Sequence, residues 1–142
     1  MEKIKSFQKN HNTLEPGFSL SGEQQGVKTF DLRFKKPNCG DFIAVAAMHS
    51  IEHLLATILR NSSYKDDVIY FGPMGCRTGF YLLTVNLNEQ TVKDLLIQSL
   101  KKVQEFDFVP GAEKIECGNY LEHDLDGAKI ECEKYLRLLE NN

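Results

Sequence analysis

The sequence of 142 residues lacks any long uninterrupted apolar run. No stretch approaches the ~18 apolar residues that a membrane-spanning helix requires, which argues against a transmembrane segment. The N-terminal segment MEKIKSFQKNHN has basic residues but no apolar core, so it does not resemble a secretory signal peptide. We therefore expect a cytoplasmic protein.

An excess of basic charge is also lacking. The 17 Lys and Arg residues against 20 Asp and Glu residues give a net charge of -3, which argues against a general nucleic-acid-binding or anionic-membrane-binding surface. Without an export signal, the four cysteines are expected to be reduced thiols or metal ligands rather than a disulfide framework. Internal repeats, low-complexity segments and linkers are absent, so we interpret residues 1–142 as one domain.

The pattern of apolar residues predicts an α+β domain. Residues 1–26 are polar and contain several glycines, and we interpret them as an arm with little regular structure. In residues 27–34, Phe30, Leu32 and Phe34 alternate with polar residues, which predicts a half-buried strand. We expect further strands at 68–71 and 80–86, and helices at 42–60, 88–106 and 124–139. The short turn between the last two strands predicts an antiparallel sheet.

The segment HSIEHLLATILRN, which begins at His49, carries the first chemical signal. His49, Glu52 and His53 stand at i, i+3 and i+4 and therefore share one helical face, an arc roughly 100° wide. Two imidazoles one turn apart can bind the same metal ion, with the carboxylate beside it. The rest of the helix is largely apolar, which predicts a buried helix where ionisable groups are costly unless they bind something. The alternative is two core histidines that hydrogen-bond to the backbone.

A metal site needs a third protein ligand, for which the candidates are His11, His123, the four cysteines and scattered acidic residues. Cys117 precedes a glycine, which permits close approach of the backbone. Two histidines, one thiolate and an open fourth position form a catalytic arrangement, whereas the alternative for Cys117 is a buried structural thiol. Cys132 fits that structural role better because it lies on a predicted helix, and Cys39 is expected to be an incidental loop thiol.

Cys76 differs from the other cysteines because it occupies the glycine-rich turn GPMGCRTG, at residues 72–79, between two predicted strands. Arg77 adjoins it, and a neighbouring cation stabilises the thiolate form of a cysteine. We therefore expect Cys76 to be a reactive thiol, with a turn cysteine of no chemical role as the alternative.

Five sequence blocks, in one order, carry a family resemblance that covers nearly the whole chain. They are SFQKNH at 6–11, FDLRFKKPN at 30–38, HSIEHLLATILRN at 49–61, GPMGCRTGFYL at 72–82 and ECGNYLEHDLDGAK at 116–129. Together they resemble the S-ribosylhomocysteine lyase (LuxS) family of the activated-methyl cycle. The resemblance implies a small antiparallel sheet packed with helices, and a homodimer with the N-terminal arm at its interface.

The same resemblance implies a metal-dependent carbon–sulfur lyase. Its substrate would be S-ribosylhomocysteine, and its products homocysteine and 4,5-dihydroxy-2,3-pentanedione, the precursor of autoinducer-2. The implied metal ligands are His49, His53 and Cys117. Iron(II) is the native metal of the family, and zinc or cobalt often substitutes.

The resemblance also assigns roles to residues around the metal. Glu52 and Cys76 match the acid–base pair of the family. Ser6, His11 and Arg33 match positions that line the substrate site, and Ser6 and His11 are expected to reach across the dimer interface.

Two positions depart from the family pattern, which usually has aspartate where this chain has Asn10 and where Tyr70 begins YFGPMGC in place of DISPMGC. Neither change affects the implied ligands or the acid–base pair. Two other readings of the chain stay open. The first is a metallopeptidase, because H-x-x-E-H is also a peptidase pattern, although it leaves Cys76 unexplained. The second is a non-enzymatic domain with a structural metal.

Overall fold

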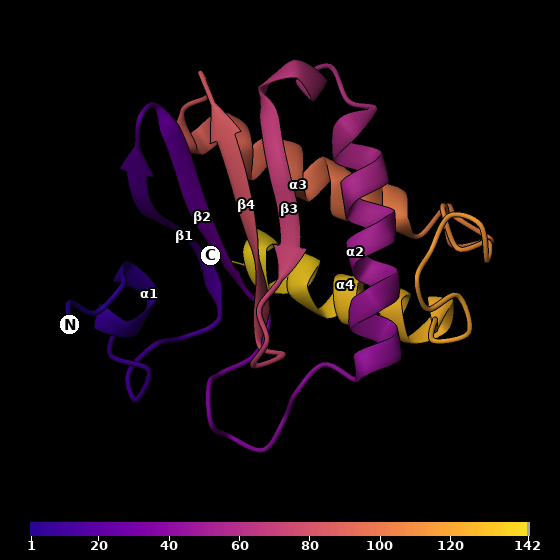
Figure 1. Ribbon diagram of the computed structural model, residues 1–142, viewed down its shortest axis with the longest axis horizontal. Helices are drawn as coiled ribbons and strands as arrows, with labels where there is room; N and C mark the ends of the chain where they lie inside the picture. Colours follow the sequence, from indigo (N-terminus) through magenta and orange to yellow (C-terminus); the bar gives the residue numbers. More distant parts are fainter. Residues whose placement is uncertain (142) are drawn as a thin grey trace.

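A four-stranded antiparallel sheet forms the centre of the computed structural model, which describes residues 1–141 (Figure 1). The strand order is β1-β2-β4-β3, with bounds β1 (Gly17–Gln24), β2 (Val27–Arg33), β3 (Val68–Pro73) and β4 (Gly79–Val85). The helical elements are α1 (Lys5–Gln8), α2 (Val45–Arg60), the 3-10 turn η1 (Lys65–Asp67), α3 (Glu89–Val103) and α4 (Leu125–Glu140). The predicted α+β class is confirmed.

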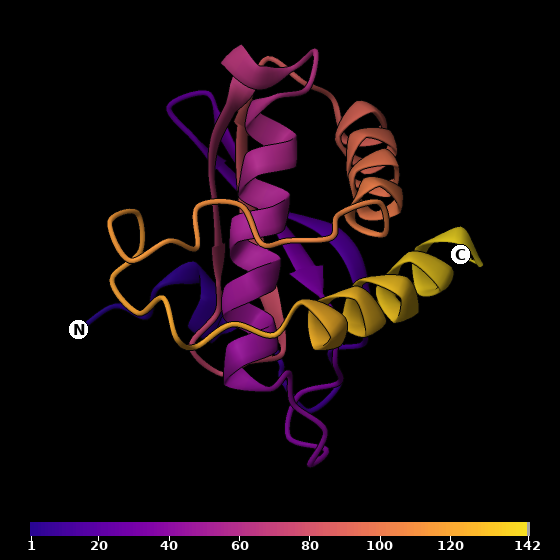
Figure 2. The ribbon, with the colours of Figure 1, turned by 90° about the vertical axis from the view of Figure 1, so that its right-hand side faces the viewer.

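The three long helices pack together on one face of the sheet. Figure 2 shows α3 and α4 on the side of the sheet away from α1, with α2 running along the β3 edge. On this face, Phe30 and Leu32 of β2 oppose Leu82 and Phe80 of β4, and all four side chains are fully buried. As the alternation predicted, the apolar side chains of β2 point into the core and the polar ones point to the opposite face of the sheet.

The opposite face of β2 is covered, although the alternation predicted a half-buried strand. Asp31 and Arg33 are only 1% and 3% exposed. Arg33 donates from Nε to Asp31 Oδ1 at 3.2 Å and from Nη2 to Oδ2 at 2.7 Å, and Lys9 Nζ lies 2.6 Å from the same Oδ2. Lys9 comes from a segment distant in sequence, so the local pattern of β2 could not reveal this cover.

The N-terminal segment contains more regular structure than expected, so the interpretation of residues 1–26 as an irregular arm is wrong. β1 pairs antiparallel with β2, and α1 adds one helical turn before it. Gln25 and Gly26 join the two strands with φ angles of 53° and 81°, the left-handed conformation that two-residue hairpin turns use. Asn-Gly or Asp-Gly is the usual signal for such a turn, and Gln-Gly is a weak one.

Side-chain caps explain two of the helix starts. Asn88 Oδ1 accepts the N–H of Thr91 at 2.8 Å, and Asp124 Oδ1 accepts the N–H of Gly127 at 2.9 Å, so both predicted starts are confirmed. Helix α2 begins at Val45 rather than at residue 42. Ile43, which precedes the N-cap residue Ala44, donates its N–H to the carbonyl of Arg77 at 3.0 Å. This hydrogen bond connects the start of α2 to the turn that contains Cys76.

Helix α2 buries one face only. Its buried residues are Ala47, Ser50, Ile51, Leu54, Leu55, Ile58 and Leu59, whereas His49, Glu52 and His53 on the other face stay partly exposed. The expectation of ionisable groups inside a buried helix is therefore wrong, and their desolvation costs less than that argument assumed. Within residues 1–141, no helix combines the length and the apolar character that a bilayer crossing needs.

Substitution of Ile51 by alanine tests the packing of α2. Ile51 is 0% exposed, so Ile51→Ala should lower the free energy of unfolding by about 2–5 kcal/mol through lost burial and a cavity. Ile130→Ala is the matched control, because Ile130 also lies within a helix but is 56% exposed. Urea unfolding followed by circular dichroism measures both, and equal losses would contradict the assigned core.

Candidate metal centre and thiol cavity

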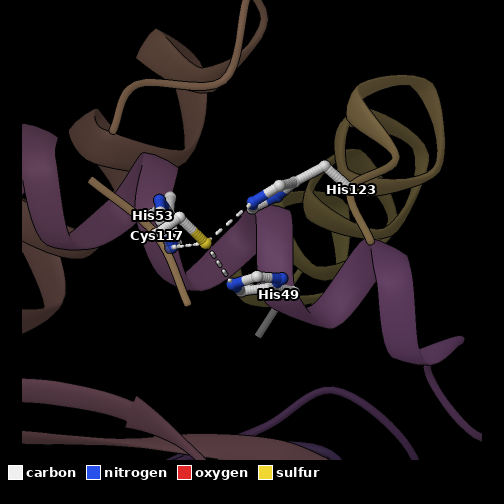
Figure 3. A group of neighbouring side chains, drawn as sticks. All are labelled: His49, His53, Cys117 and His123. Atoms are coloured by element: carbon white, nitrogen blue, oxygen red, sulfur yellow. Dashed lines mark hydrogen bonds between the residues drawn. The ribbon is translucent and has the colours of Figure 1, made fainter. Parts of the chain in front are cut away.

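Four side chains from α2 and from the segment before α4 meet in one cluster (Figure 3). Cys117 Sγ lies 3.4 Å from His49 Nε2, 3.9 Å from His53 Nε2 and 3.6 Å from His123 Nε2. The four atoms that can bind a metal lie within 4.8 Å of one another. The helical spacing of His49 and His53 brings their rings together, as predicted, and the fold adds Cys117 and His123.

The dimensions of this cluster suit a tetrahedral metal ion. Zinc lies about 2.3 Å from a thiolate sulfur and about 2.0–2.1 Å from an imidazole nitrogen, so these atoms lie about 3.5 Å apart around a tetrahedral ion. The three sulfur–nitrogen distances, from 3.4 to 3.9 Å, are close to that value. Imidazole and thiolate are also donors that iron, zinc and cobalt accept. The cluster can therefore hold a metal ion.

Backbone carbonyls hold two of the histidines in the tautomer that a metal ligand needs. His49 Nδ1 lies 2.8 Å from the carbonyl oxygen of Glu122, and His53 Nδ1 lies 2.9 Å from that of Pro110. A carbonyl oxygen only accepts, so each Nδ1 carries the proton and donates it. The lone pair of each neutral ring is then on Nε2, which faces the cluster.

His123 is held in another way. Its Nδ1 lies 3.0 Å from Ser50 Oγ, which also accepts the N–H of Asp124 at 2.8 Å. A hydroxyl can donate or accept, so this contact leaves both tautomers of His123 open. Burial, followed by repulsion from His49 and His53, lowers the pKa of His123 and favours the neutral ring. The sequence analysis counted His123 among the candidate ligands without assigning it.

The glycine that lets the backbone approach the cluster is Gly111 rather than Gly118. A Cβ on Gly118 would meet no atom within 4 Å, so the expected close approach beside Cys117 does not occur. Gly111 has a φ of 68°, and a Cβ there would lie 3.3 Å from His53 Nδ1. Glycine at 111 therefore permits the turn that brings the Pro110 carbonyl to His53.

A cavity of about 410 Å³ collects most of the other predicted site residues. Ser6, His11, Arg33 and Cys76 all line it, so the fold brings these four together within one chain. Among residues 1–141, its lining includes neither Glu52 nor any residue of the metal cluster. Glu52 instead lies on α2 between the two cluster histidines. The cavity of one chain therefore contains Cys76 but not Glu52, the other member of the acid–base pair that the resemblance implies.

The cation connected to Cys76 is Arg33, and the expected neighbour Arg77 points elsewhere. Arg77 donates from Nη1 to the carbonyl of Ile43 at 3.3 Å, and its guanidinium lies 5.6 Å from the centre of the Phe42 ring. Cys76 Sγ lies 3.0 Å from Thr78 Oγ1, to which Arg33 Nη1 donates at 2.8 Å. Arg33 therefore reaches Cys76 through Thr78, whereas the side chain of Arg77 contacts Ile43 and Phe42.

The remaining cysteines match their expected roles. Cys132 is fully buried on α4, and burial, followed by the charge of Glu131, raises the pKa of its thiol, which keeps it protonated and unreactive. Cys39 is exposed in a loop. All four cysteines are unpaired.

Comparison with known proteins gives a family match over nearly the whole chain. The family model described as S-Ribosylhomocysteinase (LuxS) matches residues 4–142. The chain belongs to this LuxS family. It is 45% identical over 148 residues to the S-ribosylhomocysteine lyase of Borreliella afzelii, covering 99% of this chain and 94% of that protein. It is 42% identical over 144 residues to the S-ribosylhomocysteine lyase of Porphyromonas gingivalis, covering 96% and 91%.

A third relative is similar to the same extent. The chain is 45% identical over 143 residues to the S-ribosylhomocysteine lyase of Clostridium beijerinckii, which covers 96% of this chain and 90% of that protein. The resemblance drawn from five sequence blocks is thereby confirmed at the level of the LuxS family.

The structure accounts for one departure from the LuxS pattern as a linked pair. A Cβ on Gly72 would lie 2.2 Å from Tyr70 Oη, because the tyrosine ring lies over that glycine. The serine of DISPMGC at this position would displace the exposed Tyr70 ring, so the observed placement of that ring goes together with Gly72. The other departure, Asn10, accepts the N–H of Asn12 on its Oδ1 at 3.0 Å, a contact that an aspartate can also make.

Replacement of one cluster histidine tests the metal centre. His53→Gln removes a nitrogen ligand and should weaken cobalt(II) or zinc(II) binding by about 100-fold. His11→Gln is the control, because His11 lines the thiol cavity and lies outside the cluster. Chelator competition measures both affinities. A native affinity in His53→Gln would contradict the assignment.

Proposed function

We propose that this chain is a metal-dependent lyase that cleaves the thioether of S-ribosylhomocysteine. The products would be homocysteine and 4,5-dihydroxy-2,3-pentanedione, the precursor of autoinducer-2. The observation that carries the proposal is the match, across nearly the whole chain, to proteins named S-ribosylhomocysteine lyase. The metal-binding cluster and the cavity with an exposed thiol supply the kinds of group that this chemistry needs.

In this proposal His49, His53 and Cys117 would hold one divalent metal, and His123 would stay a neighbour rather than a ligand, so that a fourth position is left for the substrate. Iron(II) is the expected native metal, and zinc or cobalt can take its place. When bound, the ion supplies a Lewis acid that stabilises negative charge developing on the sugar oxygens.

Two side chains move the protons. The sugar carbonyl migrates from the first carbon to the second and then to the third, and each shift removes one proton beside the carbonyl and delivers another. Cys76 as a thiolate and Glu52 as a carboxylate exchange these protons from the two sides of the sugar. Loss of a proton from the fourth carbon then expels homocysteine thiolate from the fifth carbon by β-elimination, with no net consumption of water or redox equivalents.

Polar groups of the thiol cavity suit a sugar. His11 Nδ1 lies 3.0 Å from the carbonyl of Lys9, so it donates there and leaves Nε2 as an acceptor for a hydroxyl. Arg33 uses three of its N–H groups on Asp31 and Thr78 and keeps two more for substrate oxygens. Ser6, which lines the same cavity, can both donate and accept.

We place the complete site at the interface of a homodimer. Ser6 and His11, expected to reach across the dimer, line one cavity with Arg33 and Cys76 of their own chain. If Ser6 and His11 contact the partner subunit, the cavity that they line with Arg33 and Cys76 also faces the partner, next to the partner's metal centre. Exposed apolar side chains near the two surfaces, including Phe7, Phe42 and Leu121, supply area that a partner chain can cover.

The expected compartment is the cytoplasm. Reducing compartments keep cysteines as free thiols, and all four cysteines of this chain are unpaired. The proposed chemistry also needs reduced sulfur at Cys76 and at Cys117.

Release of homocysteine from S-ribosylhomocysteine tests the activity. Cys76→Ala and Glu52→Gln, both metal-loaded, should each lower turnover by about 10²–10⁴-fold, the usual contribution of general acid–base catalysis. Cys39→Ala is the control, since Cys39 is an exposed loop thiol outside the cavity lining. Peptide cleavage without thiol release would point to a metallopeptidase. Full turnover in both variants would contradict the assignment of Cys76 and Glu52 as proton carriers.

Mixing two inactive variants tests the shared site. If each site combines Cys76 of one chain with Glu52 of the other, a Cys76→Ala/Glu52→Gln heterodimer contains one intact site. Random exchange of the two homodimers should then restore about a quarter of native turnover. Each variant alone is the control. Exchange that is complete by mass spectrometry but restores no activity would place both residues of a site on one chain.

A further inference from the structure

Thr78 lies between the thiol of Cys76 and the buried ion pair of β2. Its hydroxyl oxygen is 3.0 Å from Cys76 Sγ and accepts a hydrogen bond from Arg33 Nη1 at 2.8 Å. Asp31 holds the other side of the same guanidinium, and Lys9 binds Asp31 in turn. A continuous line of hydrogen bonds therefore joins the N-terminal segment to Cys76.

We infer that Thr78 is a positioning residue for Cys76, because its hydroxyl donates a hydrogen bond to the sulfur and so favours the thiolate. The catalytic value of this contact rests on the role proposed above for Cys76. Its effect on the reactivity of the sulfur does not depend on that role.

Arginine sets the direction of the contact. A guanidinium has N–H donors and no acceptor, so the hydroxyl oxygen of Thr78 must accept from Arg33. The hydroxyl proton of Thr78 is then free to point at another acceptor. Among residues 1–141, the side-chain acceptor within hydrogen-bonding distance of the Thr78 hydroxyl is the sulfur of Cys76.

Burial of Thr78 disfavours the opposite direction. If Cys76 donated its S–H to Thr78, the hydroxyl oxygen would accept twice and the hydroxyl proton would need some other acceptor. Thr78 is 1% exposed although it lines the cavity, so its hydroxyl has little access to water. A buried donor without an acceptor is unfavourable, whereas a hydrogen bond to a charged sulfur is stronger than one to a neutral thiol.

The backbone fixes Thr78 against movement. Its carbonyl oxygen accepts the N–H of Phe34 at 2.8 Å and that of Lys35 at 2.9 Å. Arg77, between Cys76 and Thr78, has a φ of 62°, a left-handed conformation that a non-glycine residue adopts only when its surroundings hold it. The hydroxyl is therefore oriented before any substrate arrives.

The charges along the line also favour a negative sulfur. Lys9 and Arg33 contribute two positive charges against the single negative charge of Asp31. Asp31 and Arg33 are almost fully buried, where charges are weakly screened. The excess positive charge lies on the side from which Thr78 approaches Cys76.

The rate at which iodoacetamide alkylates Cys76 tests the inference. At about pH 6 an ordinary thiol is almost wholly protonated, so the rate reports how far the protein stabilises the thiolate. Thr78→Val removes the hydroxyl with little change of shape and should slow alkylation of Cys76 about tenfold, a ratio that corresponds to about 1.4 kcal/mol. Thr78→Ser keeps the hydroxyl and should react within about twofold of the native rate.

Cys39 provides an internal control in the same sample. It is also exposed, and peptide mass spectrometry separates its alkylation from that of Cys76. Its rate should be the same in all three proteins. Native-like alkylation of Cys76 in Thr78→Val, or equal slowing in Thr78→Ser, would overturn the inference.

A measurement on the native chain covers the case in which Thr78→Val does not fold. With ¹³C-labelled cysteine, a pH titration should move the Cβ resonance of Cys76 from its thiol shift to its thiolate shift at a lower pH than that of Cys39. Titration of both resonances over the same pH range would overturn the inference. Absence of homocysteine release from the native enzyme, together with titration of Cys76 at a lower pH than Cys39, would instead reject the proposed reaction and leave the role of Thr78 in place.

Discussion

The burial of the Asp31 carboxylate is the constraint on which the thiol side of the molecule depends. A carboxylate removed from water is unfavourable unless charged donors surround it. Arg33 supplies a two-point contact from the same strand, and Lys9 supplies a third donor from the N-terminal segment. Because the guanidinium is held in this way, its remaining edge meets Thr78 in a defined position next to Cys76. The two ion pairs of Asp31 thus connect the N-terminal segment, β2 and, through Thr78, the turn that contains Cys76.

The metal side depends on a different set of contacts. Helix α2 presents His49 and His53, but the carbonyls that orient them belong to Glu122 and Pro110, in the segment between α3 and α4. The same segment contributes Cys117 and His123. The segment between α3 and α4 is therefore held to α2 by the same contacts that orient His49 and His53. The two sites share α2 as a common reference, because the start of that helix is hydrogen-bonded to the turn of Cys76.

Local signals predicted the parts of the fold that local physics decides. Asn88 and Asp124 mark helix starts because their side chains accept N–H groups within the first turn, and the structure shows both caps. The hairpin at Gln25 and Gly26 was missed because its left-handed pair lacks the usual Asn-Gly or Asp-Gly signal. The extent of burial of α2 was overestimated, because its apolar composition does not reveal which face stays uncovered.

The sequence by itself determined the family, the alternation of β2 and the shared helical face of His49 and His53. These follow from residue order and from the periods of the strand and the helix. Tertiary structure alone decided that His123 joins the cluster, that Arg33 rather than the adjacent Arg77 connects to Cys76 through Thr78, and that the cavity of Cys76 lacks Glu52. The physical reason is that these relations join residues far apart in the chain. Their distances depend on how the sheet, the helices and the connecting segments pack, and a local repeat carries no information about that packing.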